Sequence, residues 1–66
     1  MNIRVNGKLE SMERECSIKE LLAAKGLEGA AAVIDLNGRI VKAQEWDRTI
    51  LREGDVVEIL RLVGGG

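Results

Sequence analysis

The chain has 66 residues, 45% of them hydrophobic and 32% charged, and its ten Lys and Arg residues nearly balance eleven Asp and Glu residues. A chain of this length forms one domain with one thin core, and its balanced charge excludes a general nucleic-acid surface, which needs clustered positive charge. With no His and one Cys, it also lacks the usual Cys-His metal clusters and nucleophile pairs. No apolar run approaches the ~20 residues of a membrane span and no signal peptide is recognisable, so the cytoplasm is the expected location.

The first segment predicts a β-hairpin. Ile3 and Val5 alternate with polar residues. Asn6-Gly7 is the strongest short hairpin signal, because both residues adopt a positive φ at low cost. We therefore expect antiparallel strands at residues 3–5 and roughly 8–14.

The next segment predicts a helix of about two and a half turns. Ser17 and Glu20 have the spacing of a capping box at its start. Lys25 suits the negative end of the helix, and Gly26 suits a left-handed cap after it. Three apolar residues share one helical face: Ile18, Leu21 and Leu22.

The second half repeats the hairpin pattern and ends in one more strand. A short apolar strand is expected to turn at Asn37-Gly38 and to return through residues 39–42. A helical turn is expected within residues 43–55, before a turn at residues 53–55. In the last strand, alternation places Val57, Ile59, Arg61 and Val63 on one side and Val56, Glu58, Leu60 and Leu62 on the other. Apolar residues on both sides indicate a central strand, with one face against the helix and the other available to a partner.

Two single residues each have a structural and a functional interpretation. Cys16 can be a carried thiol whose pKa is lowered by the following helix, but it also fits as a small apolar staple before the helix, which we favour. Trp46 can anchor a partner, but it is the only large ring available to a thin core, so we favour packing. The basic residues of the second half are expected to be mainly solvated charges: Arg39, Lys42, Arg48 and Arg52.

The last three residues are Gly64, Gly65 and Gly66. A frayed end or a cloning scar is the structural interpretation. The functional interpretation is a tail that threads a narrow channel, because glycine has no side chain and three extended residues reach roughly 10 Å. Its carboxylate can be activated with ATP as an acyl-adenylate and then attacked by a sulfur nucleophile, which leaves a thiocarboxylate on Gly66.

These features resemble the ThiS family, the sulfur carriers of thiamine thiazole biosynthesis. The resemblance covers residues 1–66 and includes the strand order, both Asn-Gly turns and the stretch EWDRTILREGDVVEILRLVGGG. Its most specific parts are Trp46, Gly54-Asp55 and Gly65-Gly66, although a glycine pair alone also occurs in ubiquitin-like proteins. The family implies an α+β fold, the ubiquitin-like β-grasp, with a mixed sheet of four to five strands on one main helix. It also implies a single domain, residues 1–66, with a flexible tail at 64–66.

The resemblance further implies a carrier and protein co-substrate, not an enzyme, with no bound cofactor. An E1-like adenylyltransferase of the ThiF type would use ATP to adenylate Gly66. A cysteine desulfurase or another persulfide donor would supply the sulfur, and a thiazole synthase of the ThiG type would receive it. Gly64 and Gly65 would lie in the partner's active-site channel, and Leu60 and Leu62 would form the docking patch. Neither a nucleic acid nor a membrane is an expected partner.

One position departs from the family pattern, and three other functions stay open. Many relatives have Pro-Arg where this chain has Lys42-Ala43, so the partner contact made there is expected to differ. The chain could instead carry sulfur for molybdopterin or another acceptor, or become attached to lysines of other proteins through Gly66. It could also be a β-grasp module that binds without covalent chemistry.

Overall fold

The structure is a computed structural model that describes residues 1–62; Val63 and the predicted tail, Gly64–Gly66, lie outside the described residues. The elements, in chain order, are β1 (Asn2–Val5), β2 (Lys8–Ser11), α1 (Ile18–Ala24), β3 (Ala32–Leu36), β4 (Arg39–Val41), a 3₁₀ helix (Ala43–Glu45) and β5 (Val56–Arg61). The predicted hairpins, helix and last strand are all present. The helical turn expected within residues 43–55 is the 3₁₀ helix.

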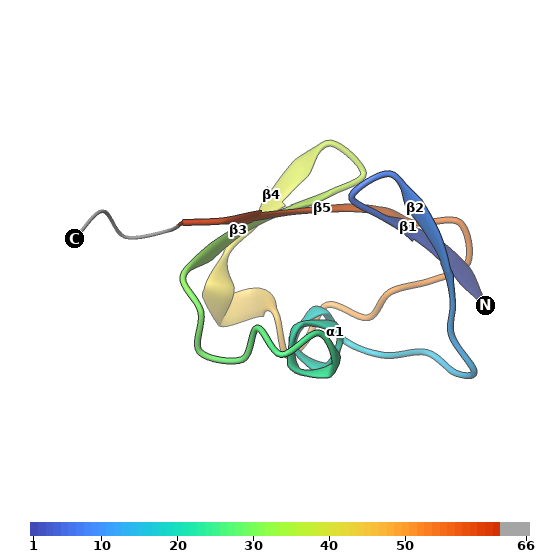
Figure 1. Cartoon of the computed structure of the whole chain (residues 1–66), viewed down its shortest axis with the longest axis horizontal. Coiled ribbons are helices and arrows are strands. Elements are labelled where there is room, and N and C mark those ends of the chain that lie inside the picture. Colours follow the sequence, from blue (N-terminus) through green and yellow to red (C-terminus); the bar gives the residue numbers. More distant parts are fainter. Residues whose placement is uncertain (63–66) are drawn as a thin grey trace.

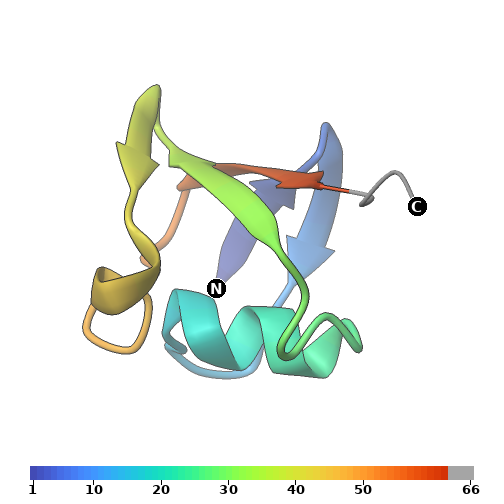
Figure 2. The same cartoon turned by 90° about the vertical axis from the view of Figure 1, so that its left-hand side faces the viewer.

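The five strands form one mixed sheet in the order β2-β1-β5-β3-β4. β1 and β5 run parallel, and every other neighbouring pair is antiparallel. α1 lies across one face of the sheet, as Figures 1 and 2 show. The predicted fold of one sheet on one helix is confirmed, and β5 is the central strand that its apolar residues indicated.

Both hairpins turn at the predicted Asn-Gly pairs. Asn6 and Asn37 have φ angles of 51° and 53°, and the glycines that follow, Gly7 and Gly38, have φ angles of 83° and 87°. Positive φ at both central residues is the requirement of a type I′ turn, whose twist matches that of the flanking strands. The turns therefore form where the sequence allows left-handed backbone at least cost.

The second strand is shorter than predicted. β2 pairs with β1 only from Lys8 opposite Val5 to Ser11 opposite Asn2. Met1 and Met12 still exchange backbone hydrogen bonds of 2.9 and 2.7 Å. Residues 13–16 then leave the sheet and lead to α1.

The predicted capping box begins α1. The Ser17 hydroxyl accepts a hydrogen bond from the Glu20 amide at 3.0 Å, and the Glu20 carboxylate accepts one from the Ser17 amide at 2.8 Å. These bonds satisfy amide groups that the first turn leaves without helical partners. The helix spans seven residues, about half a turn less than expected, and Gly26 follows with the left-handed φ of 73°.

The core lies between α1 and the inner face of the sheet, which is the face toward the helix. Its buried side chains are Ile3, Val5, Ile18, Leu21, Leu22, Ile34, Leu51 and Val57. Trp46 is partly buried against this cluster, and its indole nitrogen donates a hydrogen bond of 2.9 Å to the Val41 carbonyl. The structure thus supports the packing interpretation of Trp46.

Candidate functional site

Of the predicted docking residues, Leu60 lies near the C-terminal end of β5 and points away from α1, and Leu62 follows that strand directly. Their side chains are 62% and 54% exposed, whereas Val57 on the same strand is fully buried. Alternation along a strand explains the difference, since residues an odd number apart point to opposite faces. The predicted face of Leu60 is confirmed and Leu62 is exposed, and the contact of both residues with a partner stays a prediction.

Strand register brings further apolar residues to this outer face, the face of the sheet opposite α1. Val33 of β3 lies directly opposite Leu60. Leu9 of β2 and Ile40 of β4 are 63% and 64% exposed. The register places these residues and Val56 on the outer face. Only Val33 lies beside the end of β5; Leu9 lies level with the start of that strand and Ile40 with its middle. Alternation had already placed Val56 on this face, but only the pairing of distant strands places the other three there.

The middle of the outer face is acidic. Asp35 of β3 lies directly opposite Glu58 of β5. Like charges in directly opposed positions repel and destabilise a sheet. One Asp35 oxygen accepts a hydrogen bond of 2.8 Å from the Gly38 amide, which holds the carboxylate in place. The outer face therefore carries these two carboxylates and also Arg4, which the register places opposite Val56, among apolar side chains.

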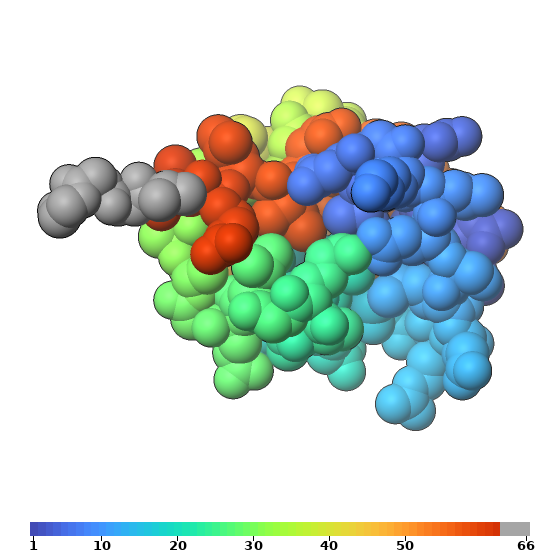
Figure 3. Space-filling model, in the orientation of Figure 1, coloured from blue at the N-terminus to red at the C-terminus, as the bar shows by residue number. Residues whose placement is uncertain are grey.

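The predicted carrier residues, Gly64, Gly65 and Gly66, lie outside the described residues. The last described residue, Leu62, donates a backbone hydrogen bond of 2.9 Å to the Ala31 carbonyl. This part of the chain, coloured red in Figure 3, lies toward one end of the molecule. The central strand therefore leads from the middle of the fold directly to the start of residues 63–66.

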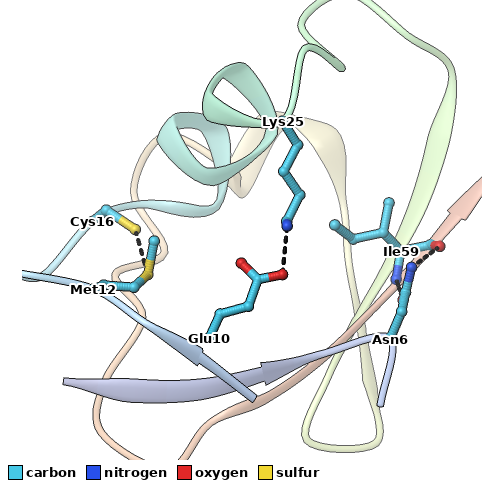
Figure 4. Close-up of polar contacts among 6 residues, drawn as sticks. All are labelled: Asn6, Glu10, Met12, Cys16, Lys25 and Ile59. Carbon is cyan, nitrogen blue, oxygen red and sulfur yellow. Dashed lines mark hydrogen bonds and ion pairs between the residues drawn. The ribbon is translucent and has the colours of Figure 1, made fainter. Parts of the chain in front are cut away.

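On the edge of β5 that faces β1, the Asn6 side chain binds the backbone of Ile59. Its side-chain oxygen accepts a hydrogen bond from the Ile59 amide at 2.7 Å, and its side-chain nitrogen donates one to the Ile59 carbonyl at 3.3 Å (Figure 4). The sequence indicated Asn6 only as a turn residue. No local pattern reveals that its side chain reaches a strand 53 positions away in the sequence.

Cys16 has the features of a structural residue. It is partly buried, and its sulfur lies 3.6 Å from the Met12 sulfur (Figure 4). Burial raises the pKa of the Cys16 thiol, and the nearby Glu20 carboxylate raises it further. A raised pKa keeps the thiol protonated and therefore weakly nucleophilic. This supports the staple interpretation over a carried thiol.

The basic residues of the second half are exposed, and two of them contact acidic neighbours. Arg48 lies 2.7 Å from Glu45, and Arg52 lies 3.8 Å from Glu15. Within residues 1–62, no group of three or more His, Cys, Asp or Glu side chains is arranged to hold a metal ion. No helix in that part of the chain is long and apolar enough to cross a membrane.

A mixed sheet in this strand order, packed on one helix with the central strand last in the chain, defines a ubiquitin-like β-grasp protein. Comparison with known proteins specifies it further. The model of the ThiS family matches residues 3–66, and the chain belongs to that family.

Individual relatives cover nearly the whole chain. The sulfur carrier protein ThiS of Bacillus subtilis (strain 168) is 31% identical over 65 residues, which are 97% of this chain and 98% of the relative. The crystal structure of the thiamine biosynthesis protein ThiS from Geobacter metallireducens is similar along the full length of both chains, with a TM-score of 0.85 and 35% identity. An NMR solution structure of a thiamine biosynthesis protein from the same organism has a TM-score of 0.81 and 33% identity, and covers all of this chain and 88% of that one. The predicted fold and family are confirmed.

Proposed function

We propose that this protein is a sulfur carrier of thiamine biosynthesis, which receives and delivers sulfur at the carboxyl group of Gly66. The observation that carries the proposal is the family match, which runs through Gly66 immediately after the central strand of a β-grasp fold. The protein is a carrier and a co-substrate of enzymes. Its fold presents the terminus, and its partners supply the catalytic groups.

The first step is activation of the terminal carboxylate. A carboxylate with a pKa of about 3.3–3.7 is ionised at neutral pH and is a poor electrophile. An activating enzyme of the ThiF type holds ATP so that a Gly66 carboxylate oxygen attacks the α-phosphorus. Pyrophosphate leaves, and the product is an acyl-adenylate whose leaving group is AMP.

The second step replaces the activated oxygen with sulfur. A persulfide sulfur from a cysteine desulfurase or another donor attacks the Gly66 carbonyl carbon, and AMP leaves. The product is an acyl disulfide joined to the donor cysteine. A thiol then attacks the sulfur of that cysteine, which forms a new disulfide and releases the thiocarboxylate on Gly66. We place these steps in the cytoplasm, where reduced thiols are available.

The outer face of the sheet is our proposed docking surface. Leu60 and Leu62 are exposed apolar residues at the end of the strand that precedes the tail. Exposed apolar residues that gather beside polar ones are typical of protein interaction sites. The activating enzyme and a thiazole synthase of the ThiG type must both receive the same terminus. We therefore propose that they bind this face in turn, with Gly64 and Gly65 in the active-site channel.

Intact-mass spectrometry tests the carrier chemistry. The protein is incubated with ATP, a ThiF-type enzyme and a persulfide-generating desulfurase. The expected result is a mass gain equal to replacing one oxygen atom by sulfur, which fragmentation assigns to Gly66. Cys16→Ser should show the same gain, because the thiol has no part in the reaction, whereas deletion of Gly66 should abolish the gain and leave the fold intact.

Two results would contradict the proposal. No gain with an enzyme set that modifies another ThiS protein would favour a non-covalent β-grasp module. A gain of a whole sulfur atom that disappears in Cys16→Ser would show that sulfur had been added to the cysteine as a persulfide. Production of thiazole phosphate when a ThiG-type synthase is added would separate the thiamine pathway from other sulfur acceptors.

A further inference from the structure

The end of β5 has different partners on its two edges. On one edge, β3 pairs with β5 as far as Ala32 opposite Arg61. On the other edge, β1 pairs in parallel only as far as Val5 opposite Val57, because the chain then turns at Asn6-Gly7. The β5 backbone beyond that point would lack a strand on the β1 side.

The Asn6 side chain occupies this position. A carboxamide offers one carbonyl acceptor and N–H donors, the same groups that a peptide unit presents to a neighbouring strand. Both groups are used, since the side chain accepts from the Ile59 amide at 2.7 Å and donates to the Ile59 carbonyl at 3.3 Å (Figure 4). The Asn6 backbone amide also donates to the Val57 carbonyl at 2.9 Å. Asn6 thus extends the β1 edge along β5 although the backbone of β1 has turned away.

We infer that Asn6 is a positioning residue for sulfur loading, an inference that rests on the proposed function. Its clamp holds Ile59 on the β1 side, three residues before Leu62, whose amide is bonded to the Ala31 carbonyl on the β3 side. Each extended residue spans at most about 3.6 Å, so the point where the tail begins limits where Gly66 can reach. A reacting group displaced by about 1 Å can lose as much as 10²-fold in rate. Holding the end of β5 on both edges therefore favours correct placement of the carboxylate in the activating enzyme.

The second hairpin provides a matched control. Asn37 has nearly the same φ and also follows a strand that pairs with β5. Its side chain accepts from the Val56 amide at 2.9 Å and donates to the Asp55 carboxylate at 3.0 Å. These bonds lie at the opposite end of β5, away from the tail. Asn6→Gly and Asn37→Gly each keep a residue that tolerates positive φ, and each removes two side-chain hydrogen bonds.

The experiment measures adenylation by ATP–pyrophosphate exchange, with a ThiF-type enzyme that adenylates the wild-type chain. We expect Asn6→Gly to lower kcat for the carrier by about tenfold, with KM changed less than about threefold, because the outer-face residues remain. Asn37→Gly should stay within about twofold on both constants. The midpoint temperature of thermal unfolding should fall by a similar amount in the two variants, because each loses two side-chain hydrogen bonds.

Asn6→Asp is the conservative variant. Its carboxylate can still accept from the Ile59 amide but cannot donate to the Ile59 carbonyl, so kcat should lie between those of wild type and Asn6→Gly. Hydrogen exchange of the Ile59 amide should be slowest in wild type, faster in Asn6→Asp and fastest in Asn6→Gly. If Asn6→Gly does not fold, kcat of Asn6→Asp relative to wild type decides, and an unchanged kcat would overturn the inference; Asn37→Asp is not a matched control, because its carboxylate would meet that of Asp55.

Equal kcat losses in the Asn6 and Asn37 variants would overturn the inference and leave Asn6 with a structural role alone. A loss confined to KM would overturn it as well, because it would place the effect on docking. Absence of exchange with the wild-type chain is a different result, since it would contradict the proposed function itself.

Discussion

The two faces of the sheet differ most clearly within β5. Val57 is fully buried beneath α1, whereas Leu60, three residues later, is 62% exposed. The same contrast occurs between Ile34 of β3, which is fully buried, and Ile40 of β4, which is 64% exposed. Apolar residues on the inner face hold the fold together, and those on the outer face contribute little to it. The residues that stabilise the fold therefore lie on the opposite side of the sheet from our proposed docking surface.

Truncation of an inner-face residue should have the largest effect on stability. Ile34→Ala removes a fully buried side chain from the middle of the core, and we expect a loss of about 2–5 kcal/mol in the free energy of unfolding. Urea unfolding followed by Trp46 fluorescence measures this loss. Ile40→Ala on the outer face is the matched control, with an expected change within about 0.5 kcal/mol. Equal losses at the two positions would contradict the division between the faces.

The inner face also depends on the start of the helix that covers it. Ser17→Ala removes the hydroxyl that accepts from the Glu20 amide, and we expect a loss of about 1 kcal/mol. Chemical denaturation measures it. Ser17→Asn or Ser17→Asp should retain most of the stability, because both side chains cap well. A loss equally large in those variants would assign the effect to the packing of buried Ser17 instead.

The stability that the capping box contributes should depend on pH, because Glu20 is charged. The hydrogen bond from the Ser17 amide is the main reason that the pKa of Glu20 is lowered. A carboxylate whose pKa is lower in the folded state contributes stability above its unfolded pKa of about 4.3 and loses it as pH falls through the folded value. Glu20→Gln should therefore be less stable than wild type at pH 7, by less than Ser17→Ala, and the difference should vanish in acid. A difference that is constant with pH would exclude this role of the charge.

Substitution on the outer face should separate binding from stability. Leu60→Asp should lower the free energy of unfolding by only about 1 kcal/mol, from the poor strand propensity of Asp and repulsion by Glu58, because the Leu60 side chain is already exposed. It should weaken binding of the activating enzyme by about tenfold or more, as loss of an interface anchor does. Calorimetric titration measures the binding. Leu9→Asp, equally exposed but on β2, is the control and should weaken binding less. If Leu60→Asp unfolds the protein, Leu60 belongs to the core and the two faces are not independent.

Removing one charge of the acidic pair on the outer face should have the smallest effect on stability. This effect should be a gain, whereas the other substitutions cause losses. Asp35→Asn removes the repulsion from Glu58 while the side-chain oxygen can still accept from the Gly38 amide. We expect a gain of a few tenths of a kcal/mol that shrinks as salt screens the charges. Thermal unfolding at low and high ionic strength tests both points. A loss of stability, or a gain independent of salt, would contradict repulsion across this face.

Local features of this fold could be predicted from the sequence because they depend on neighbouring residues. The Asn6-Gly7 and Asn37-Gly38 turns need only residues that tolerate positive φ, and the cap needs only Ser17 and Glu20 at the correct spacing. All three were found where the sequence placed them. The exposure of Leu60 also followed from alternation along one strand.

Features that depend on strand pairing could not be predicted in the same way. The register that places Val33 opposite Leu60 joins segments 27 positions apart in the sequence, 33 against 60. The clamp of Asn6 on Ile59 depends on the parallel pairing of the first strand with the last. The β-grasp order of the strands came from the resemblance to a family, because no local pattern specifies which distant strands meet.

The central position of β5 also has a consequence for how the protein is made. β1 pairs with β2, and β3 pairs with β4, but the two hairpins join into one sheet only through β5. An isolated hairpin is at best marginally stable in water. A nascent chain that lacks β5 therefore holds two hairpins with no shared sheet, and the last strand to be synthesised completes the domain. We therefore expect a chain truncated before β5 to lack a stable sheet, so that only molecules with the strand that leads to the tail reach the folded state.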